Sequence, residues 1–223
     1  MKVSQIQTKS EDQKIMKRLL LIAEKQLGKT GPNPVTAAAI IKDGQWIATG
    51  VHQGQGLPHA EALALKSAGK EAKDATLYVN LEPCTHWGSN PPCAQTIIDH
   101  GIKKVVYASK DPNPKVAAHP AIPLFQKAGI EVVEGVLSAE ADLQNEVFFK
   151  TILHKKPFVR LKTALSLDGK VALSSGESKY LTGEKTRKWV HQLRNRCDGI
   201  LVGINTVLAD NPSLNIRLPK SQI

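Results

Sequence analysis

Three potential metal ligands, far apart along the chain, place the strongest constraint on how this sequence can fold. His59 is the first, and the two others, Cys84 and Cys93, each follow a proline. One imidazole and two thiolates suit Zn²⁺, a borderline-soft ion that takes nitrogen and sulfur ligands in a tetrahedron. Three protein ligands leave one position open, which is the arrangement of a catalytic zinc site. We therefore expect a fold that brings these three side chains together.

Glu61 lies two residues after His59. At the start of a helix, this offset lets one side chain reach the metal and the other reach a water bound to it. Zinc lets that water supply hydroxide near neutral pH, and a carboxylate can pass its proton to a leaving nitrogen. Zinc held by one His and two Cys, with a non-ligand Glu nearby, is the signature of zinc deaminases. Their usual cysteine spacing is C-x-x-C, whereas eight residues separate Cys84 from Cys93 here.

Each of these features has an ordinary structural explanation when it is taken alone. A single His-x-Glu is usually part of a solvated surface, and a single Cys is usually a small buried residue. The combination of His59, Glu61 and both proline–cysteine pairs in a strand–loop–helix setting favours the metal site over these explanations.

The rest of the chain alternates short β-rich runs with helical patterns. Strands are predicted at 35–41, 45–50, 75–81, 104–108, 130–134, 158–165 and 199–204. Helices are predicted at 14–27, 59–68, 93–100, between 115 and 129, from 138 to about 154, and at 182–196. This alternation is typical of an α/β layered sheet. We find no internal repeat.

The charge is distributed unevenly between two predicted domains, 1–145 and 146–223. The first holds 16 Lys/Arg and 14 Asp/Glu, and the second holds 14 Lys/Arg and 6 Asp/Glu. A basic excess is compatible with nucleic acid, an anionic surface, a phosphorylated small molecule or only a solvated face.

Membrane, secreted and disulfide-rich classes are not indicated by the sequence. No apolar run approaches the roughly 20 residues of a membrane span, and the N-terminus has no apolar signal core. Three cysteines do not make a disulfide scaffold. We expect a cytoplasmic protein.

Four motifs resemble the bifunctional riboflavin-biosynthesis proteins. They are GPNP (31–34), GLPHAEALAL (56–65), LEPCTHWGSNPPC (81–93) and KDPNP (110–114). Members of that family deaminate diaminohydroxyphosphoribosylaminopyrimidine and then reduce the ribose of the product with NADPH. The resemblance implies an α/β fold: a cytidine-deaminase-like three-layer α/β/α domain at 1–145, then the start of a dihydrofolate-reductase-like domain at 146–223. The family's reductase is longer, so we expect only its N-terminal part here.

The resemblance also assigns roles to residues of the first domain. His59, Cys84 and Cys93 would hold zinc, and Glu61 would be the catalytic proton shuttle. Asn33 would hydrogen-bond the pyrimidine edge, since an amide offers both a donor and an acceptor, and His86 would lie near the substrate. The remaining histidines are interpreted as structural: His52, His100, His119, His154 and His191. Ala37 and the 118–120 segment depart from the family pattern, in which glycines are usual.

In the second domain the resemblance assigns cofactor and substrate contacts. The residues that would contact NADP are Ala164, Tyr180, Thr206 and Asp210. The residues that would hold the phosphorylated substrate are Ser178, Arg194, Leu214 and Arg217. Arginine suits this role because its planar guanidinium group can donate two parallel hydrogen bonds to a phosphate. No G-x-G-x-x-G motif follows a strand here, so a Rossmann domain is not predicted.

The sequence thus predicts a zinc-dependent pyrimidine deaminase of riboflavin biosynthesis. Its expected partners are the phosphorylated ribosylaminopyrimidine substrate and further copies of the chain, not nucleic acid or a membrane. Two alternatives stay open. A nucleic-acid base deaminase would be retained on single-stranded DNA at physiological salt. A non-catalytic regulator that kept the zinc fold would release no ammonia from the substrate.

Overall fold

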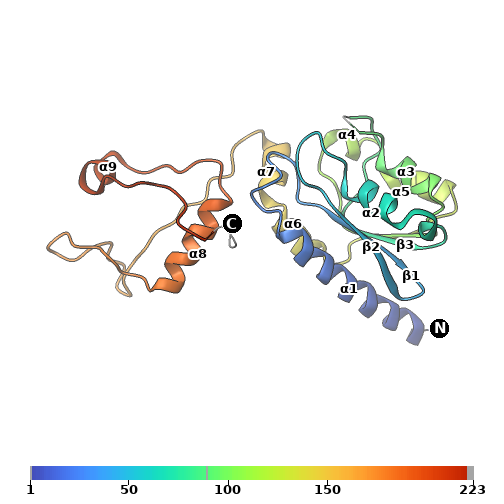
Figure 1. Cartoon of the computed structure of the whole chain (residues 1–223), viewed down its shortest axis with the longest axis horizontal. Coiled ribbons are helices and arrows are strands. Elements are labelled where there is room, and N and C mark those ends of the chain that lie inside the picture. The colour runs from blue at the N-terminus through green and yellow to red at the C-terminus, as the bar shows by residue number, and fades with distance from the viewer. Residues whose placement is uncertain (1, 89, 220–223) are drawn as a thin grey trace. The chain divides into compact units, whose positions relative to one another are not determined.

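The computed structural model describes residues 2–88 and 90–219 of the chain. The chain divides into two compact units, residues 1–158 and 159–223, and each is described here by itself (Figure 1). The first unit thus continues past residue 145, where the charge distribution predicts a domain boundary. No helix of the described residues is long and apolar enough to cross a membrane.

A five-stranded sheet forms the centre of the first unit. Its strands are β1 (Ala37–Lys42), β2 (Gln45–Val51), β3 (Thr76–Leu81), β4 (Lys104–Ser109) and β5 (Glu131–Val133). The order across the sheet is β2-β1-β3-β4-β5. β1 runs antiparallel to β2 and β3, whereas β3, β4 and β5 are parallel to one another. All five strands predicted for this part of the sequence are confirmed, with boundaries shifted by one or two residues.

Helices cover both faces of this sheet, so the predicted three-layer α/β/α domain is confirmed (Figure 1). One face packs against α2 (Ala60–Ala68), α3 (Cys93–Asp99) and α5 (Ala121–Lys127) around a core that includes Leu65, Leu77 and Phe125. The other face packs against α1 (Lys2–Glu24) and α6 (Ser138–Gln144). A short 3₁₀ turn, η1 (Gly69–Ala72), and a one-turn helix, α4 (Pro114–Ala117), lie in the connections.

The helix predicted from Ser138 to His154 is broken at Asn145 into α6 and α7 (Glu146–His154). Asn145 has a φ of −103° and ψ of 18°, outside the helical range. Its side chain makes a hydrogen bond to the backbone of Val35, far away in the sequence. A long-range side-chain contact accompanies this break, and the hydrophobic periodicity of the segment gives no sign of it.

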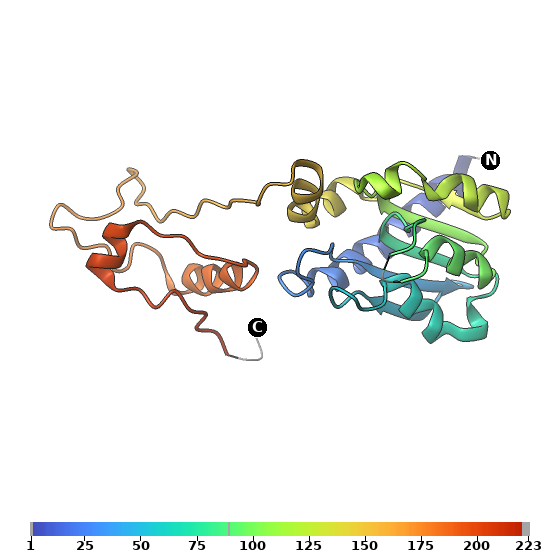
Figure 2. The same cartoon turned by 90° about the horizontal axis from the view of Figure 1, so that it is seen from above.

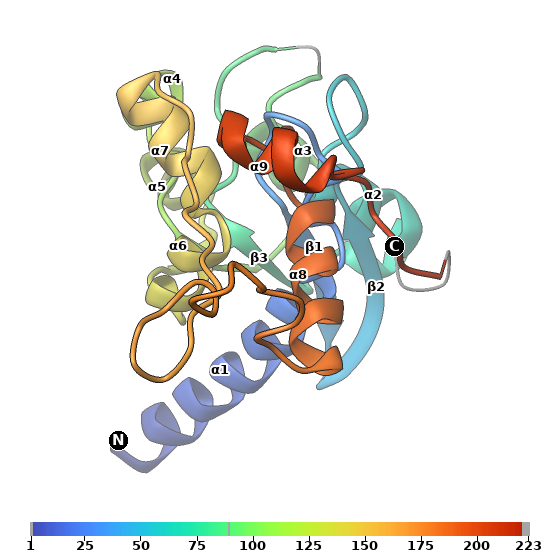
Figure 3. The same cartoon turned by 90° about the vertical axis from the view of Figure 1, so that its left-hand side faces the viewer.

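The second unit contains the helices α8 (Glu184–Asn195) and α9 (Ile204–Asp210), joined by irregular chain (Figures 2 and 3). The helix predicted at 182–196 is confirmed. The strands predicted at 158–165 and 199–204 are wrong, because these residues form no ladder. A strand exists only when its N–H and C=O groups find a neighbouring strand, and no strand is present in 159–219. None of residues 159–219 is buried.

Candidate metal centre

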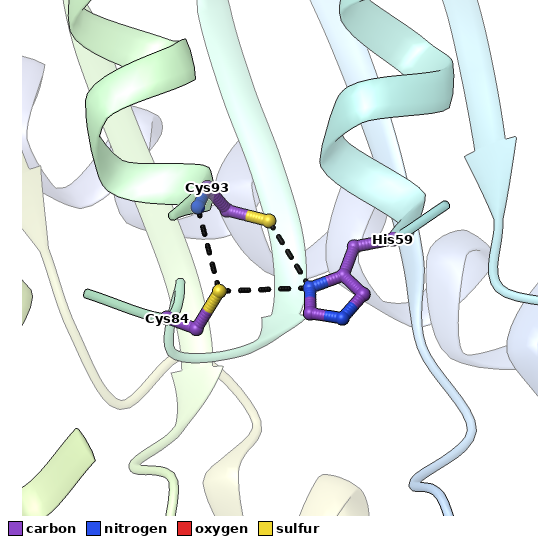
Figure 4. Close-up of side chains that lie close together, drawn as sticks. All are labelled: His59, Cys84 and Cys93. Carbon is purple, nitrogen blue, oxygen red and sulfur yellow. Dashed lines mark hydrogen bonds between the residues drawn. The ribbon is translucent and has the colours of Figure 1, made fainter. Parts of the chain in front are cut away.

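The three predicted metal ligands come from three different elements and converge at one end of the sheet (Figure 4). His59 is the N-cap of α2, Cys84 lies in the loop after β3, and Cys93 begins α3. His59 Nδ1 lies 3.2 Å from Cys93 Sγ and 3.6 Å from Cys84 Sγ. All three ligand atoms lie within 4.8 Å of one another.

This geometry fits a tetrahedral zinc ion. Bond lengths of about 2.3 Å to sulfur and about 2.0 Å to nitrogen place two tetrahedral ligands roughly 3.6 Å apart. The observed nitrogen–sulfur separations of 3.2 and 3.6 Å agree with that value to within a few tenths of an ångström. Both cysteines are buried and His59 is half-buried, so one side of the site is left for a small ligand.

Hydrogen bonds among the three ligands perturb their protonation. The pKa of the Cys84 thiol is lowered to about 4, chiefly by the hydrogen bond from Cys93 and also by His59. The pKa of His59 is raised, mainly by its hydrogen bond with Cys84. A thiol that loses its proton readily is the form of cysteine that binds a metal ion. The pKa of the Cys93 thiol, by contrast, is raised by its hydrogen bond with Cys84 and by burial, so Cys84 is the cysteine that readily takes the thiolate form.

Glu61 lies in the first turn of α2 and is 5% exposed. Burial, together with the nearby Cys84 thiolate, raises the pKa of its carboxyl group to about 7. The carboxyl group of Glu61 interacts electrostatically with Cys84 and His59, so it lies near the ligand cluster, but it is not one of the three grouped ligand residues. A carboxyl group with a pKa near the operating pH can both accept and donate a proton.

A cavity of about 200 Å³ opens onto the ligand cluster. Its lining comes from the turn before β1, the loop after β2 and the loop between the two cysteines. The lining residues are Asn33, His52, Gln55, Gly56, Leu57, His59, Cys84, His86, Gly88 and Asn90. Asn33 and His86, which the resemblance placed at the substrate, thus share one cavity with two of the metal ligands.

His52, interpreted from sequence as structural, lies in this cavity and contacts Asn33. Its Nδ1 is 3.0 Å from the carbonyl oxygen of Pro58, which can only accept a hydrogen bond, so Nδ1 carries the proton. Its Nε2 then accepts from Asn33 Nδ2 at 3.0 Å. No described residue hydrogen-bonds the Oδ1 atom of Asn33, which leaves this atom for another partner. No spacing rule identifies His52 from sequence, because its partner lies 19 residues away.

His86 has a buried ring nitrogen, Nδ1, that finds no hydrogen-bond partner among the described residues. A buried polar atom without a partner is costly. Since this atom belongs to a residue that lines the cavity, a ligand in the cavity could satisfy it.

The KDPNP segment is fixed near the site by a buried carboxylate. Glu82 accepts hydrogen bonds from the backbone N–H groups of Asp111, at 3.4 Å, and Ala121, at 3.1 Å. Burial raises the pKa of Asp111 to about 6.

The departures from the family pattern lie outside the cavity lining. Ala37 is fully buried in the core cluster that packs against α1, and His119 O accepts a hydrogen bond from Thr85.

In the second unit, two of the predicted substrate residues share a neighbour. Arg194 and Arg217 both donate to Asn215, at 2.6 and 2.9 Å, and Arg217 N–H lies 3.4 Å from His191 Nδ1. The other predicted residues are distributed over separate segments. Ala164, Ser178 and Tyr180 lie on irregular chain before α8, Thr206 and Asp210 lie on α9, and Leu214 follows α9.

Two family models match this chain. Residues 9–109 match the cytidine and deoxycytidylate deaminase zinc-binding region, and residues 157–222 match the RibD C-terminal domain. The first of these includes all three ligands of the candidate metal centre. The predicted cytidine-deaminase-like domain, and its order before a reductase segment, agree with these matches.

Full-length relatives support the same relationship. Riboflavin biosynthesis protein RibD of Actinobacillus pleuropneumoniae is 47% identical over 207 residues, 93% of this chain and 55% of that protein. Its counterpart in Escherichia coli is 43% identical over 93% of this chain and 56% of that protein.

A solved structure is similar along nearly the whole chain. It is the diaminohydroxyphosphoribosylaminopyrimidine deaminase/5-amino-6-(5-phosphoribosylamino)uracil reductase of Thermotoga maritima, with a TM-score of 0.89 and 45% identity. The match covers 96% of this chain and 61% of that one. The chain thus spans between half and two thirds of the length of these relatives.

Proposed function

We propose, from the premise that this chain belongs to the RibD family of riboflavin-biosynthesis proteins, that its first unit is a zinc-dependent pyrimidine deaminase. The observation that carries this proposal is the convergence of His59, Cys84 and Cys93 beside the buried carboxyl group of Glu61. We propose these four residues as the metal ligands and the catalytic acid–base group. When bound, zinc supplies an acidified water as nucleophile near neutral pH.

Glu61 would carry out the proton transfers of the reaction. Glu61 would accept the proton of the attacking water and deliver it to the amino group that leaves as ammonia. In the zinc-free protein the pKa of its carboxyl group is raised to about 7, chiefly by burial. Burial of Glu61 and both cysteines limits the access of bulk water to these protons.

The substrate would be the phosphorylated ribosylaminopyrimidine of the family. Asn33 would present Oδ1 to an amino group at the ring edge, since its Nδ2 is already engaged with His52. His86 would place its unpartnered Nδ1 against a polar group of the same ligand.

We propose 1–145 as the deaminase domain and 146–223 as part of an NADPH-dependent reductase domain, with residues 146–158 belonging to the first compact unit. Arg194 and Arg217 are suited to bind the substrate phosphate, because two guanidinium groups converge on Asn215. Ser178 and Leu214 would complete the substrate contacts. The residues proposed to contact NADP remain Ala164, Tyr180, Thr206 and Asp210. A cytoplasmic location and a homo-oligomeric state belong to the same proposal.

The test is ammonia release from diaminohydroxyphosphoribosylaminopyrimidine by the zinc-loaded chain and by Glu61→Gln. The amide keeps the shape of the carboxyl group but cannot accept the proton, so a loss of about 10²–10⁴-fold is expected. The control is Glu71→Gln, which alters an exposed carboxylate on η1 and leaves turnover unchanged. Turnover of Glu61→Gln within a few-fold of the unsubstituted chain would exclude Glu61 as the shuttle. No ammonia release by the unsubstituted chain would favour the regulator alternative.

A further inference from the structure

Two buried amide side chains lie behind the turn that carries Asn33. Asn80 is on β3 and Asn145 separates α6 from α7, and the two residues are 0% and 2% exposed. Both side chains reach the backbone of residues 35–37, which begins two residues after Asn33 and leads into β1. We call this pair of side chains the amide bracket.

The amide bracket satisfies three backbone groups of that segment. Val35 N–H donates to Asn145 Oδ1 at 2.8 Å, and Ala37 N–H donates to Asn80 Oδ1 at 2.9 Å. The carbonyl oxygen of Val35 accepts from Nδ2 of both side chains, at 2.9 Å from Asn80 and 3.2 Å from Asn145. Each member therefore uses its amide N–H donor and its amide oxygen acceptor at once.

The fixed segment is connected rigidly to Asn33. Only Pro34 lies between Asn33 and Val35, and its ring holds φ near −65°. On the other side, the carbonyl oxygen of Thr36 accepts from the backbone N–H of His52 at 3.0 Å. His52 in turn accepts from the side chain of Asn33. Hydrogen bonds thus link the Asn33 turn to His52 in the loop after β2, His52 to Thr36, and the neighbours of Thr36 to the amide bracket.

We propose that Asn80 and Asn145 are positioning residues that hold Asn33 in place for substrate binding. This inference rests on the proposed deaminase function, because it concerns the same cavity. Among the described residues neither amide side chain hydrogen-bonds a metal ligand or a cavity-lining residue, so they would act on Asn33 through the 33–37 segment. Asn80 Nδ2 also donates to Gln144 Oε1 on α6, at 3.2 Å. Loss of either member would leave buried backbone groups unsatisfied and let Asn33 move relative to His52.

The experiment compares Asn145→Ala and Asn145→Asp with the control Tyr78→Phe in the full zinc-loaded chain. Tyr78→Phe also removes one buried hydrogen bond, from the Tyr78 hydroxyl on β3 to Asp12, but it leaves the hydrogen bonds of the amide bracket to residues 35–37 in place. Two quantities are measured: amide hydrogen exchange at Val35 and Ala37 by NMR, and the separate values of KM and kcat for deamination.

We expect exchange at Val35 and Ala37 to become about tenfold faster in Asn145→Ala. KM should rise by about tenfold while kcat stays within about threefold, since the substrate contact is weakened and the proton shuttle is untouched. Asn145→Asp keeps the acceptor for Val35 N–H and should show smaller changes of the same kind. Tyr78→Phe should change neither KM nor the exchange of Val35 and Ala37 relative to the rest of the sheet.

Unchanged exchange and unchanged KM in Asn145→Ala would overturn the proposal, as would an equal rise of KM in Tyr78→Phe. If Asn145→Ala does not fold, Asn145→Asp decides by the same criteria. Failure of the deaminase function is distinguishable, because it would abolish turnover in the unsubstituted chain. The exchange rates would then still test whether the amide bracket holds the 33–37 segment.

Discussion

Gly50 allows α2, with His59 and Glu61 at its start, to lie directly against β2. A β-carbon added at Gly50 would overlap the carbonyl oxygen of Ala60 and come within 2.5 Å of Ala64 N and 2.9 Å of Leu63 Cβ. Two of these atoms belong to the backbone of α2, so no side-chain rotation relieves the overlap. The substitution Gly50→Ala therefore requires the helix to move away from the sheet.

The size of the effect follows from these contacts. Since β-carbons do not approach such atoms closer than 3.0 Å, α2 has to move by at least 0.5 Å at Ala64 and further at Ala60. Overpacking of this kind costs about 1–3 kcal/mol of stability. A displacement of about 1 Å at a catalytic group lowers the reaction rate roughly 10²-fold. His59 and Glu61 would move with the helix, whereas Cys84 and Cys93 would stay with β3 and α3.

Urea unfolding, zinc content per chain and ammonia release together test this prediction. Gly50→Ala should lose about 3 kcal/mol of unfolding free energy and about 10²-fold of turnover. The matched control is Gly199→Ala, where no atom lies within 4 Å of the added methyl group and φ is not positive. It should change the unfolding free energy by less than about 0.5 kcal/mol. A Gly50→Ala chain with unaltered stability and full zinc content would refute the reasoning.

Three further predictions concern the metal, the pH and the second unit. Metal analysis should show that Cys84→Ser and Cys93→Ser each lose most of the bound zinc. The control Cys197→Ser changes an exposed thiol and should keep one zinc ion per chain. Full zinc occupancy in Cys84→Ser or Cys93→Ser would contradict the proposed metal site. In the zinc-free protein, burial raises the pKa of Glu61 from its ordinary 4.5 to about 7. The stability that the protonated group contributes is therefore complete below pH 4.5 and is lost as pH rises through 7. In urea unfolding, the free energy of unfolding of Glu61→Gln should therefore exceed that of the unsubstituted chain by about 3 kcal/mol at pH 8. At pH 4 the two free energies should be equal. The same difference at both pH values would contradict this prediction. Finally, no residue of 159–219 is buried, so these residues do not enclose a nicotinamide away from water. NADPH oxidation followed at 340 nm should therefore stay far below about 1 s⁻¹, and turnover at or above that rate would contradict the prediction.

Local patterns in the sequence were sufficient to predict the sheet of the first unit and the convergence of His59, Cys84 and Cys93. The strands of the first unit have β-rich composition and turn signals at both ends, such as Asp43-Gly44, whose residues both have positive φ. The ligands could be identified because zinc accepts only a few donor types, so one His and two Cys are informative even before their distances are known.

Contacts between distant segments, by contrast, were decided only in three dimensions. Residues 158–165 and 199–204 have strand-like composition but form none, because composition cannot provide the neighbouring strand whose hydrogen bonds define one. The break at Asn145 and the place of His52 beside Asn33 have the same origin. Both depend on a hydrogen-bond partner that the chain brings close only after folding, 110 residues away for Asn145 and 19 for His52.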